Sequence, residues 1–312
     1  MSTDLTRRED RIGFACAAGA AILYGSAYPA TAVALRSFTP IGVAALACTI
    51  ALPFVIAFGW LGWLPRPAYR GLGDPARLIR LTILALLGGL LFIAAVNSAV
   101  ALSGPTVTGF VAPLYAIAAA VLAVPLLGEP IRPRTIVAFA VALVGTALLA
   151  GAAPQVGSLA GVVLALAAAV SFGLYMVLAR RWSERYALDG TLLTVANLIG
   201  RGPVLLAVEL VRSPSTLIPA DPDPAAVAAV LVIAFGASST ANLLLIASVR
   251  RVPAARSSAA LLLTPVTSAI LGVMVLDDTL APIQVIGGIL TVIGIGIGAG
   301  ALSARTRWFA GA

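Results

Sequence analysis

Long apolar stretches follow one another along the chain, and only short polar breaks separate them. A helix that crosses the hydrocarbon core of a bilayer needs about 20 apolar residues. The stretches do not alternate in the ten-residue pattern of a membrane β-barrel. The sequence therefore predicts an all-α integral membrane protein with ten transmembrane helices, in chain order Ile12–Leu35, Pro40–Trp60, Ile79–Leu102, Thr106–Leu127, Pro133–Gly151, Leu159–Ala179, Thr191–Val211, Ala225–Val249, Ala254–Leu276 and Pro282–Leu302.

The composition fits a chain that is solvated mainly by lipid. Of the 312 residues, 61% are hydrophobic and only 10% are charged, and the mean hydropathy is +1.06. A water-soluble domain carries about 25% charged residues. Histidine is absent, and Cys16 and Cys48 both fall inside apolar stretches, where a thiol behaves as a small hydrophobic group. We expect no disulfide, no metal site and no cofactor.

The positions of the arginines predict the orientation of the chain in the membrane. All 20 basic residues are arginine. If the amino terminus is cytoplasmic, only Arg36 and Arg212 fall in outer loops and only Arg201 falls within a span, while all the other arginines lie inside. Loops on the cytoplasmic side carry the excess of basic residues. We therefore expect both termini to face the cytoplasm of a bacterial inner membrane, and we interpret the net charge of +8 as a topology signal and not as a nucleic-acid-binding surface.

The chain repeats itself, and the repeat predicts its internal symmetry. The segments that begin at Glu129 and Asp278 match at one offset of 149 residues, which pairs Pro133 with Pro282, Gly145 with Gly294, and Gly151 with Gly300. Two units of five helices each must have opposite orientations, because five is an odd number. Inverted repeats of this kind are typical of carriers whose site lies between the two halves, near the middle of the membrane. We divide the chain into a first repeat, 1–152, and a second, 153–312.

Several segments of the sequence resemble a known family. They are LYGSAYPATAVAL in the first helix, a fourth helix that contains proline and ends in LLGEPI, and the glycine-rich fifth helix that begins with proline. Together with the duplication, these segments resemble the EamA-type branch of the drug/metabolite transporter superfamily over essentially the whole chain. The resemblance implies a ten-helix carrier that exports amino acids or other small metabolites.

Arg201 is the sharpest single feature of the sequence. It lies in the middle of a predicted span, where an arginine costs at least ~3 kcal/mol on insertion scales, so it should face protein or water. One interpretation is that its guanidinium binds a carboxylate or another anionic group of the solute. The other is structural: Pro203 removes a backbone hydrogen bond, and the guanidinium satisfies the freed carbonyls.

Other polar residues within spans are candidates for lining a solute site. Tyrosines could line a cavity or form an interfacial aromatic belt. Asparagine, serine and threonine could bind a solute, or join helices through hydrogen bonds and close packing. With Arg201, the candidate substrate-binding residues are Tyr24, Ser26, Tyr28, Asn97, Tyr115, Tyr175, Ser238, Asn242, Thr264 and Ser268.

The predicted function is secondary transport of a small solute by alternating access. Without lysine the chain cannot contain a GxxxxGK[ST] nucleotide-binding loop, so this chain does not use ATP directly. Two alternatives stay open: a flippase for lipids or lipid-linked substrates, and an integral-membrane enzyme, which would need clustered acids, histidines or a metal. Expected partners are the solute and the bilayer. A glycine face on the last span, Gly287, Thr291, Gly294 and Gly298, would pack within the chain or against a second copy.

Overall fold

The protein is predominantly helical in the part described by its structure, a computed structural model. That part comprises residues 2–61, 74–128, 133–151, 159–186, 188, 190–212, 217, 219–249, 251, 260–261, 263–277 and 279–303. The α-helices are α1 (Ser2–Ala34), α2 (Pro40–Trp60), α3 (Pro75–Ala85), α4 (Phe92–Val111), α5 (Tyr115–Leu127), α6 (Pro133–Gly151), α7 (Leu159–Tyr186), α8 (Gly190–Arg212), α10 (Pro224–Leu231), α11 (Ala241–Val249), α13 (Leu263–Leu276) and α14 (Pro282–Ser303). Two π-helical segments, η1 (Leu86–Leu91) and η3 (Val232–Thr240), and one 3₁₀ turn, η2 (Ala112–Leu114), interrupt them.

Six helical stretches are long and apolar enough to cross a membrane, namely 11–34, 40–58, 75–127, 159–183, 191–212 and 224–245. Three shorter apolar helices, 136–145, 263–276 and 282–294, coincide with the remaining predicted spans. The predicted start of the ninth span at Ala254 lies outside the described residues. The protein is therefore a multi-pass membrane protein.

The stretch 75–127 contains a kink where the sequence predicts two separate spans. Gly104 has φ 77° and ψ 166°, a conformation open to glycine but costly for a residue with a Cβ atom. Pro105 follows, and its fixed φ suits the first turn of the next helix. The kink separates a segment formed by α3, η1 and the start of α4 from a segment formed by the rest of α4, η2 and α5.

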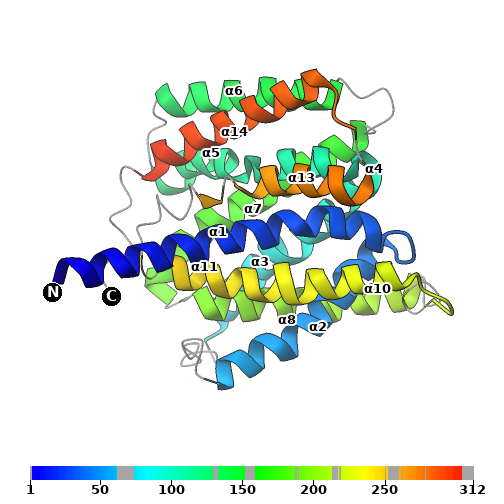
Figure 1. Ribbon diagram of the computed structural model, residues 1–312. Helices are drawn as coiled ribbons and strands as arrows, with labels where there is room; N and C mark the ends of the chain where they lie inside the picture. The colour runs from blue at the N-terminus through cyan, green and yellow to red at the C-terminus, as the bar shows by residue number, and fades with distance from the viewer. Residues whose placement is uncertain are drawn as a thin grey trace.

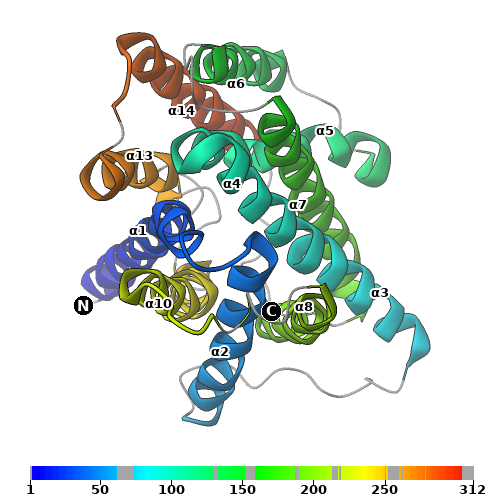
Figure 2. The same cartoon turned by 90° about the vertical axis from the view of Figure 1, so that its right-hand side faces the viewer.

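The two halves of the chain interlock instead of forming separate bodies. The most extensive contacts all join an element before residue 152 to one after it: α6 with α14, α4 with α7, α2 with α8, α5 with α7, and α1 with α13 and α11. Figure 1 shows the helices running roughly side by side, with α6 and α14 paired at one edge. Turned by 90°, the bundle has α2 at the opposite edge (Figure 2). Residues from both halves therefore meet in the middle.

The contact between α6 and α14 is reciprocal. A methyl group at Gly145 would lie 2.5 Å from the backbone nitrogen of Thr291, and one at Gly294 would lie 2.6 Å from that of Ala142. The 149-residue offset pairs Gly145 with Gly294 and Ala142 with Thr291. Ala142 precedes Gly145 along α6, whereas their contacts on α14 occur in the reverse order, at Gly294 and Thr291. The two equivalent helices therefore run antiparallel. Gly287, Thr291 and Gly294 of the α14 glycine face thus pack tightly against α6 within the chain.

A second pair of glycines repeats this relation nearer the centre. A methyl group at Gly25 of α1 would lie 3.2 Å from the backbone nitrogen of Ser268 in α13. One at Gly173 of α7 would lie 2.8 Å from the backbone nitrogen of Ala119 in α5. The paired positions are separated by 148 and 149 residues. The two repeats therefore build equivalent helix pairs, α1 with α13 and α7 with α5.

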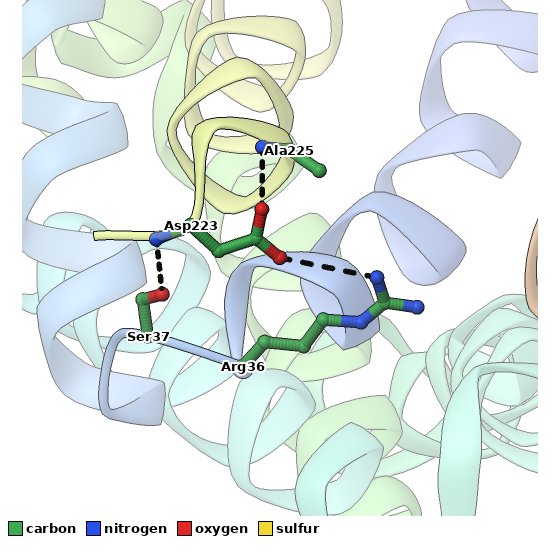
Figure 3. A network of polar contacts seen from close by, with 4 residues as sticks. All are labelled: Arg36, Ser37, Asp223 and Ala225. Carbon is green, nitrogen blue, oxygen red and sulfur yellow. Dashed lines mark hydrogen bonds and ion pairs between the residues drawn. The ribbon is translucent and has the colours of Figure 1, made fainter. Parts of the chain in front are cut away.

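An exposed polar network joins the halves where α1 ends and α10 begins. The backbone N–H of Asp223 donates to Ser37 Oγ at 2.9 Å, and Asp223 Oδ1 accepts from the N–H of Ala225 at 2.9 Å, which caps α10 (Figure 3). Asp223 Oδ2 also lies 3.9 Å from Arg36 Nη1. We call these four residues the Asp223 network. Exposed ion pairs contribute about 0–1 kcal/mol, so this link is weak.

Candidate functional site

Arg201 lies in the middle of the 23-residue helix α8 and is buried, with 9% of its surface exposed. Its Nε has no hydrogen-bond partner among the described residues, and within them no carboxylate forms an ion pair with it. The guanidinium lies within hydrogen-bonding reach of the Cys48 thiol on α2. A buried donor without a partner costs about 1–3 kcal/mol, and more when it is charged. Arg201 therefore keeps hydrogen-bonding capacity for an acceptor.

Two tyrosines from different helices, Tyr24 of α1 and Tyr175 of α7, lie near this guanidinium. A third, Tyr115 of α5, lies near Tyr24. Each tyrosine lies deep among protein atoms and yet is only half-buried at its surface. Partly accessible polar rings deep inside a membrane protein are typical of a solute site. We define the central cluster as Tyr24, Tyr115, Tyr175, Asn197, Arg201 and Asn242.

The hydroxyl of Tyr24 links the two repeats within the central cluster. It donates to Asn242 Oδ1 at 2.8 Å. Asn242 Nδ2 in turn donates to the backbone carbonyls of Ala237, at 3.3 Å, and Ser238, at 3.0 Å. Both carbonyls belong to η3, and a π-helical segment disturbs the regular pairing of the backbone. Asn242 therefore satisfies two backbone carbonyls of η3 and positions the Tyr24 hydroxyl at the same time.

The other π-helical segment, η1, makes room for Tyr175 and α8. A methyl group at Gly88 would lie 2.5 Å from Tyr175 Cγ, and one at Gly89 would lie 3.2 Å from the backbone oxygen of Asn197 and 3.5 Å from Arg201 Cδ. Tyr175 lies within hydrogen-bonding reach of Asn197. The glycine pair thus allows α7 and α8 to approach η1 closely enough to bring these three side chains together.

Aromatic rings border the central cluster on the α4 and α7 side. The ring of Phe172 lies 4.6 Å from Phe92, 4.9 Å from Tyr115 and 5.2 Å from Tyr175, measured between centroids. All four residues are half-buried. We call them the aromatic wall. Such a wall offers apolar contact surface next to the charged group of Arg201.

Several predicted site residues lie in structural contacts instead. Asn97 Nδ2 donates to the carbonyl of Pro40 at 3.1 Å, which ties α4 to the start of α2. The Ser26 hydroxyl donates to the carbonyl of Leu23 in its own helix at 2.9 Å. Tyr28 is 8% exposed and packs in a hydrophobic cluster with residues of α4, η2 and α7, although it also lies near Tyr115.

Thr264, Ser268 and Ser238 are likewise buried in helix contacts. Thr264 and Ser268 face Gly25 across the seam between α1 and α13, and the Ser268 hydroxyl lies 3.4 Å from the carbonyl of Pro105. Ser238 contributes its backbone carbonyl to Asn242. Of the predicted residues, the structure brings together Tyr24, Tyr115, Tyr175, Arg201 and Asn242.

The structure adds Asn197 and Phe172, which the sequence analysis did not select. Asn197 precedes Arg201 by four residues, so both lie on one face of α8. Phe172 follows Tyr24 by 148 residues, the same separation as Gly25 and Gly173. Helical spacing and the repeat offset were therefore signals that could have identified both residues.

Glu209 is the acidic residue nearest to the site along α8. It is 2% exposed and accepts a hydrogen bond from the Thr39 hydroxyl, which itself accepts from the N–H of Gly42. Its carboxylate thus lies at the amino terminus of α2, where the helix dipole favours negative charge. Eight residues separate it from Arg201, about 12 Å along a helix. In the described residues, no three acidic, cysteine or histidine side chains form a group that could hold a metal.

Comparison with known proteins identifies the family. The sequence pattern of the EamA-like transporter family matches residues 11–151 and again 159–297. A solved crystal structure shares 22% sequence identity and superposes with a TM-score of 0.66, over 96% of this chain and 99% of that chain. No curated protein matches the chain significantly. The family pattern covers both halves and nearly the whole length, and the chain belongs to the EamA-like transporter family of the drug/metabolite transporter superfamily.

Proposed function

We propose that the protein is a secondary transporter of a small amphipathic metabolite, such as an amino acid or a similar solute, which it exports across the inner membrane by alternating access. The observation that carries this proposal is the central cluster. It gathers polar groups of α1, α5, α7, α8 and α11, from both repeats, around a buried guanidinium midway along α8. Such a site between repeats is what alternating access requires.

The proposal includes ten membrane spans arranged as two inverted sets of five. The kink at Gly104 divides the stretch 75–127 into two spans, and α10, η3 and α11 together make one. The antiparallel contact of α6 with α14 supports the inversion. The distribution of the arginines along the sequence supports a cytoplasmic position for both termini. A tag placed before Ser2 is then cleaved by protease in inverted vesicles and protected in intact spheroplasts, whereas the opposite result would reverse the orientation.

The Asp223 network suits a closure that must open in each cycle. It joins α10 of the second repeat to the segment that follows α1 in the first. Its ion pair is exposed on both sides, with side-chain exposures of 53% and 37%, so breaking it costs little. In the proposed orientation this network lies on the outer side, where it holds the halves together while the site faces inward.

Uptake into liposomes that contain the purified protein tests the proposed function. The panel contains amino acids, organic acids, amines, nucleosides and sugars, each with and without a proton gradient, and protein-free liposomes are the control. We expect saturable uptake of at least one solute and acceleration by the same solute preloaded on the other side. Uniform failure together with scrambling of labelled lipids would instead identify a flippase.

A further inference from the structure

The charges around the central cluster restrict the class of solute that it accepts. Among the described residues, the buried charged side chains are Arg77, Arg201 and Glu209. Arg77 lies in the first turn of α3, and Glu209 accepts from Thr39 at the start of α2. Arg201 is thus the charged member of the central cluster, and its Nε is unpartnered within the described residues. Within the described part of the chain, no carboxylate pairs with this positive charge.

Resting on the proposed function, we propose that the transported solute is a small organic anion with one carboxylate and an aromatic body, and with no amino group. Its carboxylate binds Arg201, and its ring lies against the aromatic wall. This inference is narrower than transport of an amphipathic metabolite, because it excludes zwitterionic amino acids as the favoured solutes.

The Arg201 guanidinium is the reason to propose a carboxylate on the solute. Its planar donors match the two oxygens of a carboxylate, and such charge-assisted pairs are stronger than neutral hydrogen bonds. A bound monoanion also neutralises the cluster, so that neither charge stays unpaired in the low-dielectric interior. Because Nε is buried without a partner in the described residues, binding would complete the hydrogen bonds of Arg201.

The acceptors of the central cluster are the reason to propose a solute without an amino group. An ammonium is best received by a carboxylate, and the central cluster contains none; Asn242 Oδ1, which can accept two hydrogen bonds, already accepts one from the Tyr24 hydroxyl. Glu209 lies about two turns further along α8 and accepts from Thr39. A zwitterion would therefore place a second cation near Arg201 without a carboxylate to receive it, and burying such a charge is costly.

The aromatic wall is the reason to propose an aromatic ring in the solute. Its four rings are partly accessible, and the Phe172 ring lies within 5.2 Å of each of the other three, those of Phe92, Tyr115 and Tyr175. Tyr115 and Tyr175 belong to both the wall and the central cluster, so a solute of one ring and a short acid chain spans the two. Tilted and edge-to-face ring contacts add to the burial of apolar area.

Three solutes with the same phenyl ring and different charge test this inference in proteoliposomes. They are 3-phenylpropanoate, an anion; phenylalanine, a zwitterion; and 2-phenylethylamine, a cation. We expect uptake of 3-phenylpropanoate to exceed that of phenylalanine by about tenfold or more, the factor expected for one unsatisfied charged group, and to exceed that of the amine further. Excess 3-phenylpropanoate should inhibit uptake of any other substrate.

One isosteric substitution gives a second readout. Asn197→Asp places a carboxylate in the central cluster, one turn before Arg201 on α8, and should lower the ratio of 3-phenylpropanoate to phenylalanine uptake by about tenfold. If wild-type protein moves phenylalanine as fast as 3-phenylpropanoate or faster, the inference is wrong and the proposed transport function stands. If none of the three solutes and no member of the wider panel moves, both are overturned.

Discussion

Hydrogen bonding decides which of the polar residues within the spans are available to a solute. The side chains of Asn97 and Ser26 donate hydrogen bonds to the carbonyls of Pro40 and Leu23, respectively. Arg201 keeps a buried donor that no described residue satisfies, and Tyr24 joins the repeats through Asn242. We therefore rank Arg201 and Tyr24 above Asn97 and Ser26 as contacts for a solute.

Two substitutions in α1 compare these kinds of residue. Tyr24 bonds to a residue of the other repeat, and Ser26 bonds within its own helix. Tyr24→Phe removes the 2.8 Å bond to Asn242, so we expect uptake to fall about two- to tenfold, the equivalent of one lost hydrogen bond. Ser26→Ala removes a bond within α1 and should leave uptake unchanged. Initial rates at equal amounts of reconstituted protein provide the measurement. Equal rates for Tyr24→Phe and wild type would contradict the role of the hydroxyl.

Glu209 is expected to stabilise the fold at the start of α2. Glu209→Ala leaves the Thr39 hydroxyl without its acceptor and removes a negative charge from a helix amino terminus, so unfolding should become easier by about 1–3 kcal/mol. Glu9→Ala removes an exposed carboxylate paired with Arg251 and should cost at most about 1 kcal/mol. Melting temperatures in detergent compare the two variants. A Glu209→Ala protein as stable as Glu9→Ala would refute this role.

At the scale of helices, apolar length predicted most elements but not their internal irregularities. The predicted spans Pro40–Trp60 and Pro133–Gly151 coincide with α2 and α6. Helix α1 instead begins at Ser2, because its polar first turns continue the helix beyond the apolar segment. The segments η1 and η3 were not predicted, since a π-helical turn depends on contacts with neighbouring helices and leaves no hydrophobic period of its own.

The two π-helical segments offer a matched test of how η1 shapes the site. A methyl group at Gly88 would lie 2.5 to 2.9 Å from ring atoms of Tyr175, whereas one at Gly236 of η3 would meet Leu23 Cδ2 at an ordinary 3.6 Å. Overpacking costs about 1–3 kcal/mol, so Gly88→Ala should reduce uptake by about tenfold or more. Gly236→Ala should retain wild-type uptake. Uptake assays on protein that elutes as a single species give the comparison, and equal activity of both variants would show that Tyr175 need not keep its position.

At the scale of the whole molecule, the repeat in the sequence predicted the symmetry but not the pairing of the halves. The offset of 149 residues was visible in the prolines and glycines of α6 and α14. That these helices pack on one another, and that Gly25 meets α13 while Gly173 meets α5, depends on how two copies close around a centre. For the same reason the sequence could propose Tyr24, Tyr175 and Arg201 separately, while only the fold brings them together.

The transport proposal depends on Arg201 at this centre. The decisive measurement compares the initial uptake rate of the transported solute by Arg201→Gln with that by wild type, at equal melting temperature and equal reconstitution. Arg251→Gln, which removes an exposed arginine paired with Glu9, serves as the control. We predict that Arg201→Gln loses uptake by about tenfold or more, because the charge-assisted bond to the solute is gone, while Arg251→Gln transports normally. Uptake by Arg201→Gln at the wild-type rate would contradict a solute site at the central cluster.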